Sequence, residues 1–258
     1  LLFCVVLPLA GQAPGGVPGP TYWRKPATLI TDKATVAREQ YWNGWPTLSA
    51  VHEERVMLPQ KPVTLFTVFR PQDASVEETV YSITQRHTPA FILTNRRLAN
   101  LQDTTYLNLP IDFWRKPRIT TWMHSFADQG AARVSLLTCN RADLPVTSGQ
   151  GDIAEVVLYP RFLSATEQAR VHTYLALKYG VALARGQDYL SATGEVLWSG
   201  RRDSAYAHRI TGIGRAEATN WYQGQSRFQT AEATLHLGIQ PLQQPNGQPD
   251  PRLPNNSY

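Results

Sequence analysis

Paired carboxylates are the residues of this sequence whose types and spacing could support catalysis. Hydrolysis of a glycosidic bond uses two carboxyl groups that face one cleft, about 5 to 9 Å apart. Alternate positions of a strand lie on one face of a sheet, so an E-x-D or E-x-E spacing would supply such a pair. The sequence offers three candidate pairs: Asp152 with Glu155, Glu53 with Glu54, and Glu77 with Glu78.

None of the three pairs has the spacing that this chemistry needs. Asp152 and Glu155 are three residues apart in DIAEV, so a regular strand would point them to opposite faces. The other two pairs are adjacent residues near turns. We therefore predict structural or solvated roles for all of these carboxylates, no catalytic residue, and a protein that is not an enzyme.

Other catalytic and metal-binding motifs are incomplete. The nearest match to the serine-hydrolase elbow, GQSRF, lacks the final glycine, and GIGRAE is half of a dinucleotide motif. The six histidines show no H-x-x-x-H spacing and no cluster with cysteine, so no metal site is expected. Cys139 lies in the apolar segment VSLLTCN, which predicts a buried structural thiol.

Tryptophans are a second kind of candidate, because exposed indole rings stack on sugars. Packing in the core is the alternative for each ring, and both interpretations stay open, so the ligand-binding residues are unknown. The candidates are Trp42, Trp45, Trp114, Trp122, Trp198 and Trp221.

Short strands must position these side chains. Each predicted strand is rich in β-branched and aromatic residues and is bounded by Pro, Asn, Asp or Gly, a pattern typical of an all-β sandwich. Apolar residues on both faces indicate that 62–71 and 152–159 are inner strands. The predicted strands are 62–71, 79–85, 90–95, 104–110, 118–127, 132–140 and 152–159.

One strong helix is predicted over residues 165–179. Ser164 and Glu167 form the S-x-x-E capping box, and Gly180 supplies the residue that ends the helix. Val171, Tyr174, Leu175 and Lys178 share one face, on which the lysine stem lies along apolar surface. The helix is expected to brace the fold without a catalytic role.

The chain changes character after Gly180. DYLSATGEVLWSG predicts strand, turn and strand around Thr193-Gly194, and short glycine-containing strands follow. We place a domain boundary near residue 185, with a small β-rich domain at 186–242. Residues 243–258 are rich in Pro, Asn and Gln and are expected to be a linker or a truncated tail.

The N-terminus and the charge bear on location and partners. The apolar run before Gly11 matches the core of a secretory signal peptide, so 1–11 is interpreted as its remnant and Gln12 as the first mature residue. No segment is long and apolar enough to span a membrane. The net charge is +5, but the basic residues occur as scattered pairs, so nucleic-acid binding is not expected.

The segment GDIAEVVLYPRFLSATEQARVHTYLALKYG resembles the closing strand and helix of concanavalin A-like (laminin-G-like) domains in large secreted bacterial proteins. NGWPTLSAV and PVTLFTVFRP resemble early strands of that family. The later segment around RITGIGR is similar to a companion β-rich domain of unknown function in surface proteins exported by type IX secretion.

This resemblance implies a concanavalin A-like jelly roll over 12–185 and a secreted or cell-surface location. It implies a non-catalytic binding or adhesion module within a longer polypeptide, with a glycan or a surface protein as partner. A glycoside hydrolase and a structural spacer are the alternatives. No cofactor is expected. A structural calcium is the one ion that the family leaves open, and the acidic, glycine-rich stretch usual after TYWRKPATLITDK is absent.

Overall fold

The computed structural model describes most strands and the helix of the chain, with gaps between them. The described residues are 13–25, 41–48, 52–58, 62–72, 75–85, 88–101, 105–109, 117–125, 130–138, 149, 151–206, 210, 212–216, 221–229, 234–239, 246–247 and 252.

Contacts within the chain define two compact units. The sandwich unit comprises Pro20–Trp42 and Pro46–Phe162, and the helix unit comprises Leu1–Gly19, Asn43–Trp45 and Leu163–Tyr258. The division by contacts therefore falls between residues 162 and 163 rather than near residue 185. The domain limits given above stay a prediction.

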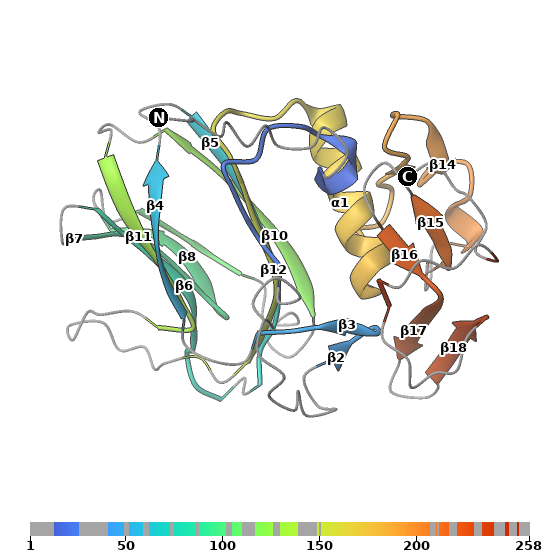
Figure 1. Cartoon of the computed structure of the whole chain (residues 1–258), viewed down its shortest axis with the longest axis horizontal. Coiled ribbons are helices and arrows are strands. Elements are labelled where there is room, and N and C mark those ends of the chain that lie inside the picture. Colours follow the sequence, from blue (N-terminus) through green and yellow to red (C-terminus); the bar gives the residue numbers. More distant parts are fainter. Residues whose placement is uncertain are drawn as a thin grey trace, which may run out of the picture. The chain divides into compact units, whose positions relative to one another are not determined.

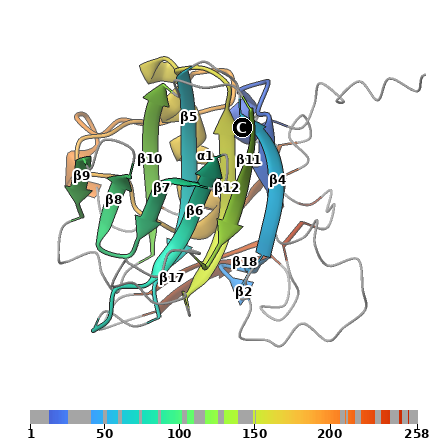
Figure 2. The same ribbon diagram turned by 90° about the vertical axis from the view of Figure 1, so that its left-hand side faces the viewer.

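The sandwich unit consists of two antiparallel sheets (Figures 1 and 2). The four-stranded sheet has the order β1 (Tyr22–Arg24), β12 (Asp152–Tyr159), β5 (Pro62–Arg70) and β10 (Arg118–Ser125). The six-stranded sheet has the order β4 (His52–Leu58), β11 (Gly130–Leu136), β6 (Thr79–Gln85), β7 (Thr88–Thr94), β8 (Arg97–Asn100) and β9 (Thr105–Asn108).

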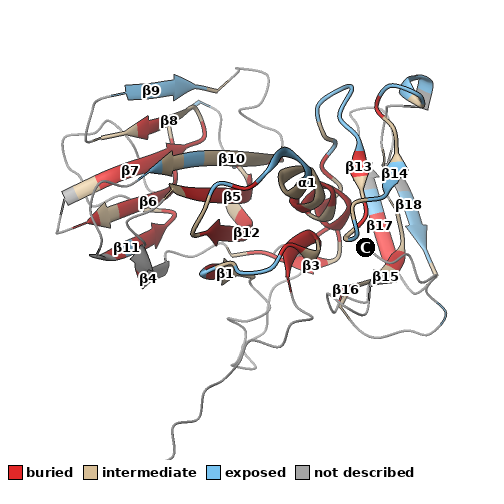
Figure 3. Cartoon of the chain, turned by 90° about the horizontal axis from the view of Figure 1, so that it is seen from above, coloured by how far each residue is buried: buried red, intermediate tan, exposed pale blue. Residues whose placement is uncertain are grey.

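The core of this unit lies between the two sheets. Leu65 and Phe69 of the four-stranded sheet belong to one buried cluster with Ile83, Leu93 and Val134 of the six-stranded sheet. Strands β5 and β12 are buried along nearly their whole length (Figure 3). The prediction that they are inner strands is confirmed.

The six-stranded sheet extends past the edge of the four-stranded sheet. Phe91 of β7 stacks on Trp122 of β10, so β8 and β9 lie beyond the last strand of the facing sheet. Leu98 still packs against the core, but Leu107, directly opposite it on β9, is 64% exposed. We call the core-facing side chains of Leu98, Leu107, Trp122 and His124 the open margin of the sandwich.

The predicted strands are confirmed, and the part of the chain that the structure describes is mostly antiparallel β-structure with one α-helix. Strands β1, β4 and β8 of the sandwich unit are additional. Strand β4 reads HEERVML and β8 reads RLAN, so the first carries charge within its hydrophobic pattern and the second is too short to show a period.

The helix unit joins one α-helix to three short hairpins (Figure 1). The strands pair as β13–β14, β15–β16 and β17–β18, and the first pair confirms the predicted strand–turn–strand. Its elements are a 3₁₀ turn (Pro14–Gly16), α1 (Ala165–Tyr179), β13 (Tyr189–Leu190), β14 (Val196–Trp198), a 3₁₀ turn (Ser204–Tyr206), β15 (Gly214–Ala216), β16 (Trp221–Gln223), β17 (Gln225–Gln229) and β18 (Thr234–Gly238). Strands β2 (Tyr41–Trp42) and β3 (Trp45–Pro46) flank the Asn43-Gly44 turn, where the chain passes between the units.

Helix α1 begins and ends where the sequence predicts. The Ser164 hydroxyl accepts a hydrogen bond from the Glu167 N–H (3.3 Å), and the Glu167 carboxylate accepts one from the Ser164 N–H (2.9 Å). Gly180 ends the helix with a left-handed φ of 61°. Its backbone also passes so close to β17 that a Cβ would lie 2.9 Å from the Arg227 carbonyl oxygen.

No helix in the described ranges is long and apolar enough to cross a membrane.

Gly151 sits where β12 begins, and we predict that Gly151→Ala destabilises the sandwich unit. A Cβ there would lie 2.3 Å from the Arg70 carbonyl oxygen, a backbone atom that cannot move aside easily. The expected loss is about 1–3 kcal/mol of unfolding free energy, measured by urea denaturation. Gly212→Ala is the control, because no atom lies within 4 Å of its Cβ position. Equal stability of the two variants would contradict the prediction.

Candidate functional site

A β-bulge changes the geometry of the first carboxylate pair. Backbone pairing sets Asp152 opposite Arg70 and Glu155 opposite Val68, with a register shift between Ile153 and Glu155. Residues directly opposite each other share a face, and Arg70 and Val68 are two positions apart on β5. Asp152 and Glu155 therefore lie on the same face of the sheet. The prediction that they point to opposite faces is wrong, because the bulge adds one residue to the alternation.

Both carboxylates of this pair make structural contacts. Asp152 forms an ion pair with the Arg70 guanidinium, whose Nε donates to it over 3.1 Å. The Trp23 indole N–H donates to Glu155, which is 1% exposed. A carboxylate held in this way is not presented to a substrate.

Glu77 is held similarly. The Arg97 Nε and Nη2 donate to its two oxygens over 2.7 and 2.8 Å, and the Thr94 hydroxyl donates to it over 2.7 Å. This is the bidentate geometry that arginine favours with a carboxylate. Glu53 and Glu54 lie on β4 opposite Ser135 and Val134, and their side chains fall outside the described part of the structure.

A small pocket at one end of the sandwich brings two of the predicted carboxylates together. Glu78 and Asp152 both line it, together with Arg70, Asn95 and Thr79. The Asn95 side chain accepts from the Glu78 N–H over 3.0 Å. The space inside it that a bound molecule could occupy is about 10 Å³, which is far below the roughly 300–1,000 Å³ that is usual for ligand sites.

The open margin contains a stack of aromatic rings. The centroids of Phe91 and Trp122 are 3.6 Å apart, and those of Trp122 and His124 are 4.8 Å apart with nearly parallel planes. Two neighbours thus stack on the Trp122 indole, and the partly exposed His124 is the ring nearest the end of β10. Further along the face, burial lowers the pKa of Arg118 to about 10, and its guanidinium lies 5.1 Å from the Phe69 ring.

The other tryptophan rings are less accessible to a ligand than Trp122. Trp42, Trp45 and Trp221 are buried, and Trp198 is partly buried with its ring edge-on to Tyr189. Trp114 lies outside the described residues. Of the predicted sugar platforms in the described ranges, only the Trp122 stack and Trp198 therefore reach the surface.

In the helix unit, Lys178 is buried together with its charged group. Its side chain is 2% exposed, and Nζ donates to the Tyr174 hydroxyl over 2.8 Å. Nζ also lies 4.7 Å from the Trp45 ring and 5.1 Å from the rings of Tyr174 and Tyr179. The sequence predicts that the lysine stem lies along apolar surface, and in the structure the ammonium is buried as well, where the aromatic rings and the phenol replace water around it.

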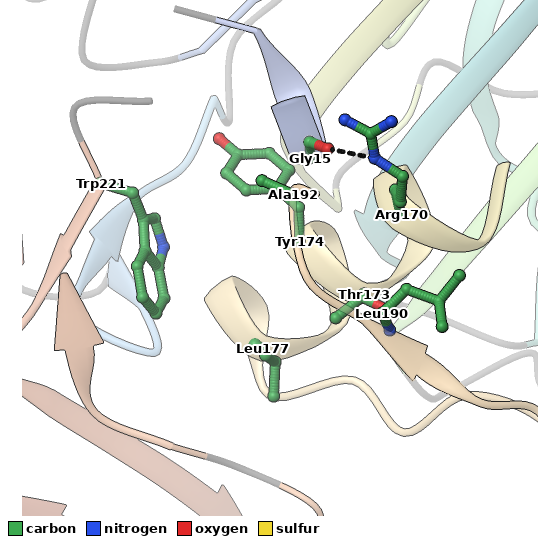
Figure 4. Close-up of a pocket in the computed structure, with 8 residues that line it drawn as sticks. All are labelled: Gly15, Arg170, Thr173, Tyr174, Leu177, Leu190, Ala192 and Trp221. Carbon is green, nitrogen blue, oxygen red and sulfur yellow. Dashed lines mark hydrogen bonds between the residues drawn. The ribbon is translucent and has the colours of Figure 1, made fainter. Parts of the chain in front are cut away.

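A shallow pocket lies beside α1 (Figure 4). Tyr174, Leu177 and Trp221 contribute to its largely apolar wall, and it measures about 290 Å³ including its mouth. Arg170 donates from Nε to the Gly15 carbonyl over 3.2 Å. The Thr173 hydroxyl accepts from the Leu190 N–H over 2.8 Å. These polar groups hold neighbouring chain segments in place.

Histidines and acidic residues do not gather into a metal centre among the described residues, where no group of three or more His, Cys, Asp or Glu side chains could hold an ion. The basic pairs contact their neighbours. Arg96 donates to the Ser75 carbonyl, Arg97 binds Glu77, and Arg202 binds Asp203.

Sequence reasoning missed two residues at these sites: His124, and Lys178 as a buried cation. His124 had one available signal, since Trp122 and His124 are two apart on a strand and share a face. Tyr174 and Tyr179 are local neighbours of Lys178, whereas the Trp45 ring comes from a distant segment that no local pattern reveals.

A family model described as "Domain of unknown function (DUF8202)" matches residues 167–258. No curated protein and no solved structure matches the chain. The matched stretch begins in the first turn of α1. It therefore includes Lys178 and most residues that line the shallow pocket beside α1, but not the sandwich unit. It agrees with the expectation of a domain of unknown function in this part of the chain and assigns no chemistry to it.

Replacing Lys178 tests whether its volume or its charge supports the helix unit. We predict that Lys178→Ala costs about 2–5 kcal/mol, because it leaves a cavity among the rings. Lys178→Met keeps the length of the side chain and is expected to stay within about 1.5 kcal/mol of the wild type. Urea denaturation measures both. A methionine variant as unstable as the alanine variant would show that the ammonium contacts dominate instead.

His172 on α1 predicts a pH dependence of stability. Burial lowers its pKa to about 4, from an ordinary value of 6.5. Between these values the unfolded chain binds the proton and the folded chain does not, so stability falls as the pH drops from 6.5 to 4. His172→Gln should reduce this fall by about 1–3 kcal/mol. Identical pH profiles of the variant and the wild type, from thermal unfolding, would contradict the assignment.

Proposed function

We propose that this chain is a non-catalytic binding or adhesion module that acts outside the cell. Its sandwich unit is a concanavalin A-like jelly roll, and its ligand is a glycan or a glycosylated surface protein. The helix unit is a companion domain that braces the chain within a longer surface protein exported by the type IX route.

The observation that carries the non-catalytic part is the state of the carboxylates. Asp152, Glu155 and Glu77 each accept hydrogen bonds from a neighbouring side chain of the same unit. General acid catalysis and nucleophilic attack both need a carboxyl group that can reach the substrate. Three of the candidate carboxylates serve to hold strands and loops together instead.

The jelly-roll assignment is supported by the order of elements. The segment that resembles the end of concanavalin A-like domains forms β12 and then α1, a strand and helix in direct succession. Strand β12 is an inner strand of an antiparallel sheet that faces a second antiparallel sheet. The signal-like apolar run before Gly11 supports export.

The glycan assignment is supported by the open margin. Sugars present flat C–H faces that pack on aromatic rings, with polar groups at the rim. His124 and the edge of Trp122 offer such rings beside exposed apolar surface at Leu107. Because the margin is an overhang, an extended chain of sugars can lie along it without entering a deep cavity.

A glycoside hydrolase is the second candidate, and one observation favours it. The bulge in β12 sets Asp152 and Glu155 on the same face, and Glu78 shares a pocket with Asp152. A catalytic pair formed from them would have to break the contacts with Arg70 and Trp23 when substrate binds.

We predict binding on a glycan array and no hydrolysis by the whole chain. His124→Ala should weaken binding about fivefold, because a stacked ring is worth about 1 kcal/mol. His236→Ala, an exposed histidine on β18, is the control and should bind as the wild type does. Incubation with β-glucans should release no reducing sugar.

Two outcomes would overturn the proposal. Release of reducing sugar that is lost in Glu155→Gln would establish the hydrolase instead. A folded chain that binds no glycan and no surface protein of the producing cell would be a structural spacer.

A further inference from the structure

Strand β9 is the outermost strand of the six-stranded sheet, and no strand in the described ranges pairs with its outer edge. All four of its residues are exposed (Figure 3), with Tyr106 at 65% and Leu107 at 64%. Exposed edges are templates for pairing with another strand.

The hydrogen-bond pattern shows which backbone groups face outward. The Leu109 N–H donates to the Arg96 carbonyl over 2.7 Å. In an antiparallel pair the bonded positions alternate, so Leu107 and Thr105 bond to β8 in the same way. The N–H and C=O groups of Tyr106 and Asn108 therefore point away from the sheet.

Charged side chains, prolines and bulges protect many natural edges from pairing, and none of them occurs in β9. Its short length of four residues is a protection that it shares with other natural edges and that keeps any pairing short. Strand β9 reads TYLN, and it pairs with β8 in a regular register. The other three edge strands of the described sandwich, β1, β4 and β10, each contain arginine. Strand β9 is thus the uncharged edge.

We propose that β9 pairs antiparallel with β9 of a second copy of this chain. The pairing is centred on Leu107, so that Tyr106 lies opposite Asn108 of the partner subunit. Each outward N–H then meets an outward C=O, which gives four interchain hydrogen bonds. Leu107 lies opposite Leu107 of the partner subunit in a non-hydrogen-bonded pair, where side chains approach most closely.

A second copy fits this edge in its hydrogen-bond spacing, its charge and its side chains. The outward groups are two residues apart, and a two-fold axis through Leu107 satisfies all of them on both strands at once. The strand has no charge, so it does not repel its own copy. The two leucines, each largely exposed in the single chain, cover one another.

The paired sheets form one continuous surface. Residues opposite each other across the new pair share a face, so the open margins of both copies lie on the same side. The pairing uses Leu107 of the open margin, but it does not depend on what the module binds.

Disulfide trapping tests the register. In a Cys4→Ser, Cys139→Ser background, Leu107→Cys should form a dimer under mild oxidation, because the opposed Cα atoms lie within disulfide reach. At µM protein concentration, disulfide formation in Leu107→Cys should be about a hundredfold faster than in Val196→Cys. The reason is that pairing gives the two opposed thiols an effective concentration of mM order. Val196 is 51% exposed on β14 and serves as the control for random collisions.

The result can overturn the proposal in two ways. Tyr106→Cys is a second control, on the same strand. No disulfide in Leu107→Cys, or equal rates of disulfide formation in Leu107→Cys, Tyr106→Cys and Val196→Cys, would show that β9 does not pair in this register.

Sedimentation of the untreated chain gives a second measurement. Tyr106→Pro removes an outward N–H but no bond to β8, so it should shift the dimer to monomer and keep the thermal stability of the wild type at concentrations where that is monomeric. The pairing would also be refuted by a wild type that stays monomeric at protein concentrations about 100 times higher than in the trapping experiment.

Discussion

The last carbonyl groups of α1 must find donors outside the helix, and the helix unit is organised around how they do so. Helices leave their final four carbonyls without internal partners. The Gln223 amide donates to the Leu177 carbonyl over 2.9 Å, and the Asn43 amide donates to the Lys178 carbonyl over 2.8 Å. Asn246 in turn donates to the Asn43 carbonyl over 2.9 Å. Side-chain amides both donate and accept, so a few of them link the helix end to segments far apart in the sequence.

The sequence predicted those elements of the fold that depend on interactions between residues close together in the chain. The capping box at Ser164, the glycine at 180 and the apolar β-segments are each decided by neighbours within a few residues, and each element formed as expected. Strand β4 was missed because its charges are tolerated at a sheet edge, a tertiary circumstance. The bulge in β12 had no local mark either, and one inserted residue was enough to reverse the inferred face of Glu155.

The candidate sites show the same division between local and distant causes. Residue types alone drew attention to Asp152, Glu155 and Glu77, but their partners Arg70, Trp23 and Arg97 decide whether they can react. Those partners are 20 to 132 residues away in sequence. Burial acts in the same way on Lys178, whose ammonium is surrounded by rings that two separate segments supply. Charge without context is therefore a poor guide to reactivity in this chain.

The helix unit is built from three separate segments of the chain, so a single short gene segment cannot encode all of it. A gene segment that encoded only the stretch matched by the family model, residues 167–258, would leave behind the Ser164 hydroxyl, Gly15 and Asn43. The transplanted helix would then lack its N-terminal cap and a donor for one of its last carbonyls. Recombination that moved this stretch alone would deliver a helix unit that must find substitutes in its new host. We therefore expect the sandwich and the helix unit to be inherited together, on one gene segment.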